Sequence, residues 1–197
     1  MFTGIITSTG KLNKKRDSVF IFNTDRAFCR KLRPGASIAV NGICLTILAK
    51  PSENSFSVEV MPETKKRTML KKLKSNGLVN LELPATLNSL LSGHLVSGHI
   101  DGTAKLKKII PKKNSRVLKF SIARSLSKYI VKKGSITING ISLTVIDINK
   151  NYFTVGIIPY TREKTMLKII RVNDIVNIEI DLVAKYLEKL LNYEKKR

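Results

Sequence analysis

The chain has 197 residues with a formal net charge of +22; 43% of the residues are hydrophobic and 25% are charged. That length predicts one domain or two small ones, and no apolar run approaches the roughly eighteen residues that a transmembrane helix needs. The charge is compatible with nucleic-acid binding, but the basic residues are spread along the chain, and only 6% of the residues are aromatic, with no Trp, which leaves little material for base stacking.

Strands dominate the expected secondary structure of the first half. Segments rich in β-branched and aromatic residues predict strands at 18–23, 44–49, 55–60 and 79–83. The strict alternation in SFSVEV (55–60) predicts a half-buried strand. An Asn-Gly pair at 41–42 predicts a tight turn, the segment DRAFCRKLRPG predicts a helix that ends on its Gly, and Pro62 opens a short helix.

The second half repeats this pattern. Strands are predicted at 117–122, 142–148, 152–158 and 175–180, with a second Asn-Gly turn at 139–140. SLSKYIVKKG predicts a helix that ends on its Gly, and Pro159 opens another short helix. About six antiparallel strands per half predict a small closed barrel in each.

The two halves are also similar in sequence. Four blocks recur in the same order with small insertions: MFTGIITSTGKL over LVSGHIDGTAKL, SIAVNGICLTI over SITINGISLTV, MPETKKRTML over IPYTREKTML, and VNLEL over VNIEI. We interpret this as a tandem duplication. It divides the chain into a first barrel at 1–94, a second barrel at 95–184, and 185–197 as the end of a C-terminal helix that begins near 182.

The C-terminal tail has no counterpart in the first half. Asp181 is placed to cap a helix. Apolar side chains fall on one face of that helix at Leu182, Val183, Tyr186, Leu187, Leu190 and Leu191. Such a face must be buried, either on the barrels of the same chain or on copies of the helix in an oligomer, and we favour the oligomer.

Neither a metal site nor a redox motif is expected. Cys29 and Cys44 form no C-x-x-C pair and fit a reducing compartment. His94 and His99 are the only histidines, and a spacing of five does not place them on one helix face. The N-terminus lacks the basic and apolar regions of a secretory signal, so we expect a cytoplasmic location.

The positions where matching blocks differ are the candidates for chemistry. Two equivalent pockets suit an enzyme that holds two copies of one ligand, and its reaction requires that the two sites differ. In the alignment of the two repeats, Phe2 corresponds to Val96, Ile5 to His99, Cys44 to Ser142 and Glu63 to Tyr160. Thr46 and Thr144 are the same residue in both repeats. Taken singly, these residues also fit structural roles: Gly4 and Gly98 as turn positions, and Cys44 as a small core residue.

The motifs MFTGII, NGICLT, MPET, GHLVSGHID, NGISLTV and IPYT, in this order, resemble the riboflavin synthase family of the alpha-chain type, over essentially the whole chain. The resemblance implies an all-β fold of two tandem six-stranded Greek-key β-barrels plus a C-terminal α-helix that joins three chains. It implies a transferase that binds two molecules of 6,7-dimethyl-8-ribityllumazine per active site, one at an N-terminal barrel and one at the C-terminal barrel of a neighbouring chain. A four-carbon unit passes between them, giving riboflavin and a pyrimidinedione without an external cofactor or metal.

The resemblance also implies site residues. The N-barrel site would contain Gly4, Ile5, Ile6, Cys44, Leu45, Thr46, Glu59, Val60, Met61, Pro62, Glu63 and Thr64. The C-barrel site would contain Gly98, His99, Ile100, Lys133, Ser142, Leu143, Thr144, Ile157, Ile158, Pro159, Tyr160, Thr161 and Arg162. The catalytic candidates are Phe2, Cys44, His99, Ser142, Thr144 and Asp181. Tyr160 stands where some members of the family have an acidic residue.

The residues themselves suit this chemistry. Histidine exchanges protons near neutral pH, so His99 is a candidate base for the acidic C7 methyl group of the lumazine. Thr46 and Thr144 lie two residues after Cys44 and Ser142 and should share their strand faces. Water, a ribityl hydroxyl, Cys44 or Ser142 could each supply the nucleophile at C7, and the sequence does not choose among them.

Two other functions remain as alternatives. A lumazine-binding protein without catalysis would share the fold, but the motif blocks are kept in both halves, which favours the enzyme. A nucleic-acid-binding barrel comes last. The resemblance also raises an association with lumazine synthase, on which the sequence is silent.

Overall fold

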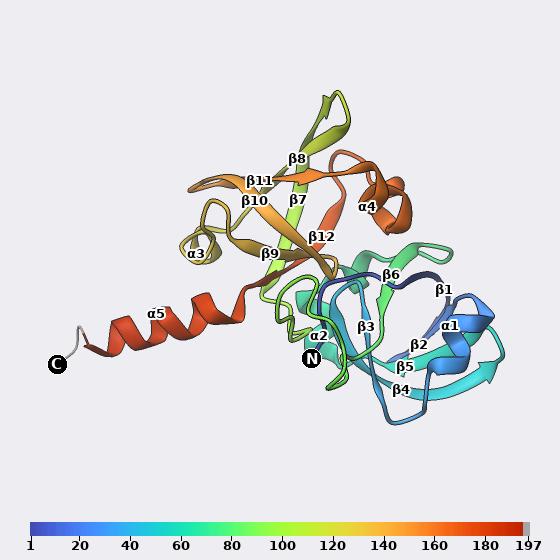
Figure 1. Ribbon diagram of the computed structural model, residues 1–197. Helices are drawn as coiled ribbons and strands as arrows, with labels where there is room; N and C mark the ends of the chain where they lie inside the picture. The colour runs from blue at the N-terminus through green and yellow to red at the C-terminus, as the bar shows by residue number, and fades with distance from the viewer. Residues whose placement is uncertain (195–197) are drawn as a thin grey trace.

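The computed structural model describes residues 1–194 and contains two closed barrels of six antiparallel strands (Figure 1). In the first barrel the order around the ring is β1-β2-β5-β4-β3-β6, and β6 pairs back to β1. Its strands are β1 (Ser8–Arg16), β2 (Val19–Asn23), β3 (Ser37–Val40), β4 (Ile43–Ser52), β5 (Ser55–Glu59) and β6 (Leu78–Glu82). Because β2 pairs with β5 and β3 with β6, the connections follow a Greek-key pattern.

The second barrel repeats this topology strand for strand. Its order is β7-β8-β11-β10-β9-β12, and β12 pairs back to β7. The strands are β7 (Gly102–Lys112), β8 (Ser115–Ser121), β9 (Ser135–Ile138), β10 (Ile141–Asn149), β11 (Tyr152–Ile157) and β12 (Ile175–Ile180). The register shifts between Leu12 and Lys14 in β1 and between Leu106 and Lys108 in β7, so even the irregularities recur. The predicted fold class is confirmed.

The helices are short and lie between strands. They are α1 (Arg26–Lys31), α2 (Pro62–Arg67), η1 (Met69–Lys72), α3 (Arg124–Ser127), α4 (Pro159–Lys164), η2 (Met166–Lys168) and α5 (Leu182–Glu194). Pro62 and Pro159 open α2 and α4 as predicted. The prediction that α1 and α3 end on glycine is wrong, because α1 stops at Lys31, before Gly35, and α3 stops at Ser127, before Gly134. Arg33 precedes Pro34, and a residue in that position disfavours helix.

Each barrel has its own apolar core. Phe22 stacks on Phe56 in the first core, and Phe120 stacks on Phe153 in the second. The strand β5 differs from its prediction as half-buried, because Ser55 and Ser57 are buried as well as Phe56. Its outer face is covered: the Cys29 thiol of α1 donates to the Ser55 carbonyl, and the Ser57 hydroxyl donates to the Ala49 carbonyl.

Four buried asparagines join the barrels in a symmetric pattern. In one half of the pattern, Asn80 Nδ2 donates to the Asn139 carbonyl and Asn80 Oδ1 accepts from the Met166 amide. The equivalent Asn177 Nδ2 donates to the Asn41 carbonyl, and its Oδ1 accepts from the Met69 amide. The two Asn-Gly turns therefore pack against each other, with Asn41 and Asn139 at positive φ, as such turns require.

The helix α5 extends away from both barrels (Figure 1). Asp181 Oδ1 accepts from the Val183 amide, so the predicted cap is present. The apolar face at Val183, Tyr186, Leu187, Leu190 and Leu191 is exposed, so it is not buried on the chain's own barrels. Residues 195–197 of the predicted tail lie outside the described part. Among residues 1–194, no helix is both long and apolar enough to span a membrane.

Candidate active site

The outer faces of β4 and β10 carry the candidate side chains. Ile43, Leu45 and Ile47 fill the first core, so strand alternation turns Cys44 and Thr46 outward. The second barrel does the same with Ser142 and Thr144. Leu45 and Leu143 point into the cores at 6% and 8% exposure, so only their backbone atoms are available to a ligand on this face.

The N-terminal segments of the two repeats cross over and lie on each other's barrel. Phe2 and Val96 form an antiparallel bridge where the segments meet. Beyond it, the Gly4 carbonyl accepts from the Ser142 amide at 2.8 Å, and the Gly98 carbonyl accepts from the Cys44 amide at 2.9 Å. The predicted grouping of these segments is therefore wrong. Gly4, Ile5 and Ile6 belong with the second barrel, and Gly98, His99 and Ile100 belong with the first.

Close packing explains why both crossing points are glycines. A Cβ on Gly4 would lie 2.6 Å from Ser142 Cβ, and one on Gly98 would lie 2.6 Å from Cys44 Cβ. Both glycines also have positive φ, +77° and +82°. Ile6 packs on the second core and Ile100 on the first, so each N-terminal segment also contributes an apolar side chain to the barrel of the other repeat.

Two buried glutamates hold the crossing segments in place. Glu82 accepts from the Thr3 amide at 2.7 Å and from the Thr3 hydroxyl at 2.8 Å, and Glu179 accepts equivalently from Ser97. Burial raises the pKa of both carboxyl groups, and the hydrogen bonds from Thr3 and Ser97 oppose that rise. Sequence analysis did not identify either glutamate, because the partners of each are about eighty residues away.

The first-barrel site is a small pocket of about 150 Å³. It brings together the predicted residues Cys44, Glu63, Thr64 and His99, which come from β4, α2 and the segment of the second repeat. Arg67 forms an ion pair with Glu63 at its edge. The complete lining is Ile43, Cys44, Glu63, Thr64, Arg67, Thr68, Gly98, His99 and Ile100. A candidate base thus lies beside a thiol on an exposed strand face.

The second-barrel site has a different histidine. His94, from the connection between the repeats, places Nδ1 2.7 Å from Ser142 Oγ and Nε2 3.1 Å from Thr137 Oγ1. Burial lowers the pKa of His94, and the charge of Asp181 opposes this effect. Asp181, a predicted catalytic residue, therefore acts on this site electrostatically. Sequence analysis considered His94 only as a metal ligand and missed this contact.

Lys133 has an unusual backbone conformation. Its φ is +67°, and its amide donates to the Val145 carbonyl of β10 at 2.8 Å. Gly35 makes the same contact with Ile47 in the first barrel at φ +82°. A lysine in a conformation that favours glycine carries strain of about 1 kcal/mol, and strain of this kind concentrates at functional sites.

The remaining predicted residues lie at the ends of β5 and β11 and in the segments that run on into α2 and α4. Glu59, Met61, Pro62, Ile158, Pro159 and Tyr160 are exposed, Thr161 and Arg162 are half-buried, and Val60 and Ile157 are in the cores. Phe2 is buried at 1% exposure against Val96 and Ala39, with Cys44 packed beside them. Phe2 therefore supports the crossing of the segments rather than an open surface.

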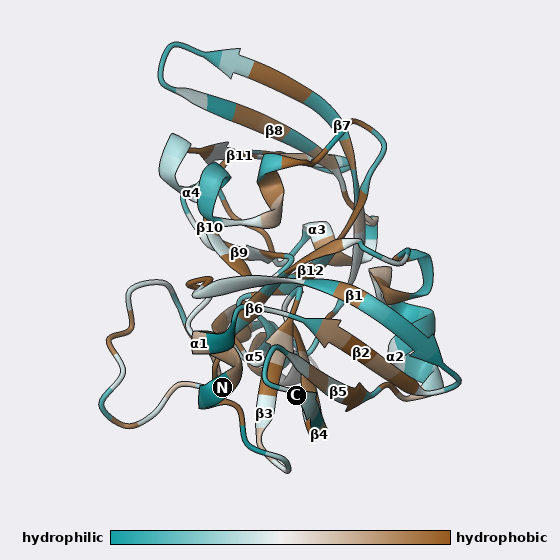
Figure 2. Cartoon of the chain, turned by 90° about the vertical axis from the view of Figure 1, so that its right-hand side faces the viewer, coloured by the Kyte–Doolittle hydropathy of each residue, from teal (hydrophilic) through white to brown (hydrophobic). Residues whose placement is uncertain are grey.

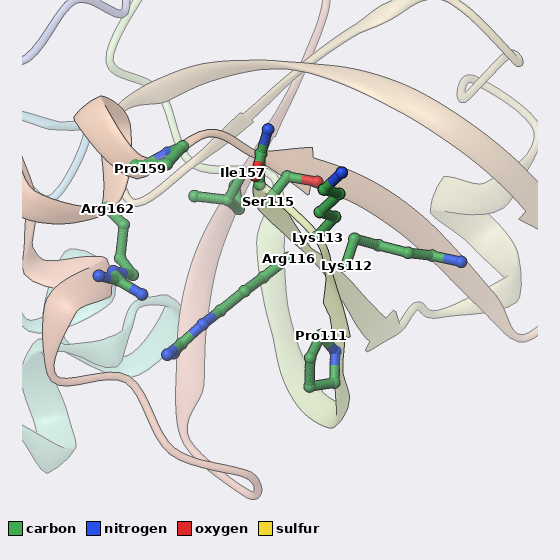
Figure 3. Close-up of a pocket in the computed structure, with 9 residues that line it drawn as sticks. Pro111, Lys112, Lys113, Ser115, Arg116, Ile157, Pro159 and Arg162 are labelled. Carbon is green, nitrogen blue, oxygen red and sulfur yellow. The ribbon is translucent and has the colours of Figure 1, made fainter.

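A larger hollow lies elsewhere, between the β7–β8 hairpin and α4, with a volume of about 430 Å³ (Figure 3). Figure 3 shows Arg116 and Arg162 extending toward the same side of it, with Lys112 and Lys113 on the hairpin. This hairpin projects beyond the second barrel (Figure 2). The lining includes neither Ser142 nor Thr144, so the structure places Arg162 at this basic hollow. Within residues 1–194, no three His, Cys, Asp or Glu side chains gather as a metal site would require.

Comparisons with known proteins agree with the duplicated domain. The Lumazine binding domain family matches residues 3–84 and 97–181, one match per repeat. Riboflavin synthase of Actinobacillus pleuropneumoniae is 44% identical, covering 97% of this chain and 90% of the relative. Riboflavin synthase of Bacillus amyloliquefaciens is 42% identical, covering 98% of this chain and 90% of the relative.

Solved structures give the same fold. The crystal structure of LumP complexed with 6,7-dimethyl-8-(1'-D-ribityl) lumazine has a TM-score of 0.80 at 21% identity, covering 91% of this chain and 99% of that one. LumP complexed with riboflavin has a TM-score of 0.81 at 23% identity over the same shares. With two domain matches and full-length relatives at 42–44% identity, the chain belongs to the riboflavin synthase family.

Proposed function

We propose that the chain converts two molecules of 6,7-dimethyl-8-ribityllumazine into one riboflavin and one 5-amino-6-ribitylaminopyrimidinedione. One lumazine gives up a four-carbon unit and the other accepts it, so the atoms balance without an oxidant or a cofactor. The observation that carries the proposal is the doubled site. Each barrel offers a polar strand face, Cys44 with Thr46 or Ser142 with Thr144, completed by a segment of the other repeat.

The two faces suit the two roles that the reaction requires. At the first barrel, His99 lines a pocket beside Cys44, where an imidazole is placed to move a proton at the C7 methyl group. At the second barrel, Ser142 and Thr144 offer hydroxyl groups that hydrogen-bond a ring lying on β10. Holding two rings in register removes much of the entropic barrier, up to roughly 7–11 kcal/mol in favourable cases.

We further propose that the working site forms between two chains of a trimer. The first-barrel pocket of about 150 Å³ is smaller than the roughly 300 Å³ at which ligand pockets usually begin, as expected for half of a site. The exposed apolar face of α5 supplies a surface that three copies would bury together. A cytoplasmic location and an association with lumazine synthase stay as predictions from the sequence.

The direct test is to incubate purified protein with 6,7-dimethyl-8-ribityllumazine alone and to follow riboflavin by its fluorescence. We expect riboflavin and the pyrimidinedione in equal amounts, and a large loss of turnover in His99→Ala without a matching loss of thermal stability. Tight binding of the lumazine without product would instead identify a lumazine-binding protein. Salt-sensitive RNA binding with neither result would favour the nucleic-acid alternative.

Removal of residues 183–197 tests the trimer. We expect the truncated chain to sediment as a monomer and to lose most turnover while each barrel still unfolds cooperatively. A truncated chain that stays trimeric would show that α5 does not hold the subunits together. Leu187→Glu is a milder variant of the same test, because it places a charge in the exposed apolar face without shortening the chain.

A further inference from the structure

The side chain of His94 is fixed at both ring nitrogens. Its Nδ1 lies 2.7 Å from Ser142 Oγ on β10, and its Nε2 lies 3.1 Å from Thr137 Oγ1 on β9. The backbone is held as well, because the His94 amide donates to the Thr3 carbonyl at 3.1 Å. These three contacts bind the end of the connection between the repeats to the second barrel and to the crossing N-terminal segment.

This arrangement fixes the orientation of the Ser142 hydroxyl. Burial lowers the pKa of His94, and Asp181 opposes that effect; the lowered pKa favours the neutral ring. A neutral imidazole has one donor and one acceptor nitrogen. In either tautomer, the 2.7 Å contact with Nδ1 uses one hydrogen-bonding position of the Ser142 hydroxyl and holds Oγ beside the ring.

Among residues 1–194, the first barrel shows no equivalent of this contact, because neither histidine ring forms a hydrogen bond with the Cys44 thiol. Cys44, the counterpart of Ser142, instead shares its pocket with His99, whose counterpart near Ser142 is Ile5. Each site thus has one histidine. His99 reaches the first site from the crossing segment of the second repeat, and His94 reaches the second site from the connection between the repeats.

We propose that His94 is a positioning residue that orients the Ser142 hydroxyl and makes the second-barrel site chemically distinct from the first. Its effect on turnover rests on the proposed function, whereas its effect on ligand binding does not. The predicted consequence is local: changing His94 alters the second site through Ser142 and leaves the first site as it was.

The test compares His94→Ala, His94→Asn and His94→Gln, with Ser92→Ala as a control at an exposed position of the same connection. The Asn side chain places a polar atom near the position of Nδ1 and keeps a partner for Ser142, whereas Gln reaches only the position of Nε2. Isoleucine methyl NMR during a riboflavin titration reports each site separately, because Ile5 belongs to the second site and Ile100 lines the first.

We expect His94→Ala to weaken riboflavin binding at the Ile5 signal about 10-fold, the value of one hydrogen bond, and to leave binding at the Ile100 signal unchanged. His94→Asn should recover most of this loss and His94→Gln should not. In a Ser142→Ala background, His94→Ala should have no further effect on kcat, because it acts through the hydroxyl.

Three results would overturn the proposal: equal losses in the Asn and Ala variants, additive losses in the double variant, or wild-type binding at both signals in His94→Ala. Thermal unfolding of each variant separates these results from a general loss of structure. If the wild-type chain formed no riboflavin, the proposed function would fail, and the NMR titration would still decide the role of His94.

Discussion

The two barrels share their framework and differ at their outer faces. Strand order, register shifts and the Asn80 and Asn177 contacts are the same in both repeats. The outward residues have changed: Cys44 against Ser142, and His99 against Ile5. Asn80 and Asn177 each have partners in the other barrel, so changing either one disturbs both barrels. Duplication therefore preserved the framework and allowed the two sites to diverge.

Alanine at the crossing glycines should produce the largest effect and should affect the two sites separately. In Gly4→Ala the new Cβ would lie 2.6 Å from Ser142, and in Gly98→Ala it would lie 2.6 Å from Cys44, each at positive φ. We expect either change to lower the free energy of unfolding by about 3 kcal/mol or more and to abolish ligand binding at the barrel it contacts.

Gly35→Ala is the matched control for that comparison. Its φ is +82°, but nothing lies within 4 Å of its Cβ position, so it should cost only the conformational strain of about 1–2 kcal/mol. Urea unfolding and the methyl titration described above measure both quantities. Equal losses in the free energy of unfolding for Gly4→Ala and Gly35→Ala would show that the crossing segment moves to make room for the new Cβ atom at little cost.

The equivalence of the framework is tested by Asn80→Ala and Asn177→Ala. Each removes an amide that serves one backbone carbonyl and one backbone amide of the other barrel. We expect each to cost about 2–4 kcal/mol, because the partners are left without hydrogen bonds. The two values should agree within the error of urea unfolding. A clear difference would mean that the two asparagines contribute unequally to the free energy of unfolding.

A pH series on the buried glutamates compares the repeats electrostatically. Burial raises the pKa of Glu82 in the folded state, so the folded protein binds its proton more tightly than the unfolded chain. The resulting stability is fully present below the ordinary glutamate pKa of 4.5 and is lost as the pH rises through the raised folded value.

The free energy of unfolding of the wild type, minus that of Glu82→Gln, should therefore fall as the pH rises above the ordinary glutamate pKa of 4.5. Glu179→Gln should show a fall of the same sign, because burial raises the pKa of Glu179 as well. Unfolding measured at closely spaced pH values gives both curves. A flat difference for Glu82→Gln would show that the carboxyl group titrates normally.

Lys133→Gly should give the smallest change, and it is a gain in stability. Glycine relieves the strain of φ +67°, so the free energy of unfolding should rise by about 1 kcal/mol. Ligand binding at the second barrel should weaken at the same time if the lysine side chain serves the ligand. Gly35→Lys is the reverse change at the matching position and should cost about the same amount. Loss of stability in Lys133→Gly would contradict this account.

Local features of the sequence predicted much of this structure. The outward direction of Cys44 and Thr46 follows from alternation along one strand, and the turns at 41–42 and 139–140 follow from the Asn-Gly pairs themselves. The crossing of the N-terminal segments could not be predicted, because it depends on which of two similar barrels a segment meets. The Glu82 contacts with Thr3 and the His94 contact with Ser142 could not be predicted either, because they join residues that are far apart in the sequence.

The exchange of segments bears on the ancestry of the chain. A single-barrel ancestor, folded alone, would have left its own strand face without the segment that completes it. Two such ancestors related by a twofold axis would have completed each other and formed two identical sites. Joining them end to end would have kept that dimer as one polypeptide and added a connection between the two repeats. His94 lies on the connection between the repeats and contacts Ser142, so this connection makes the two sites unequal.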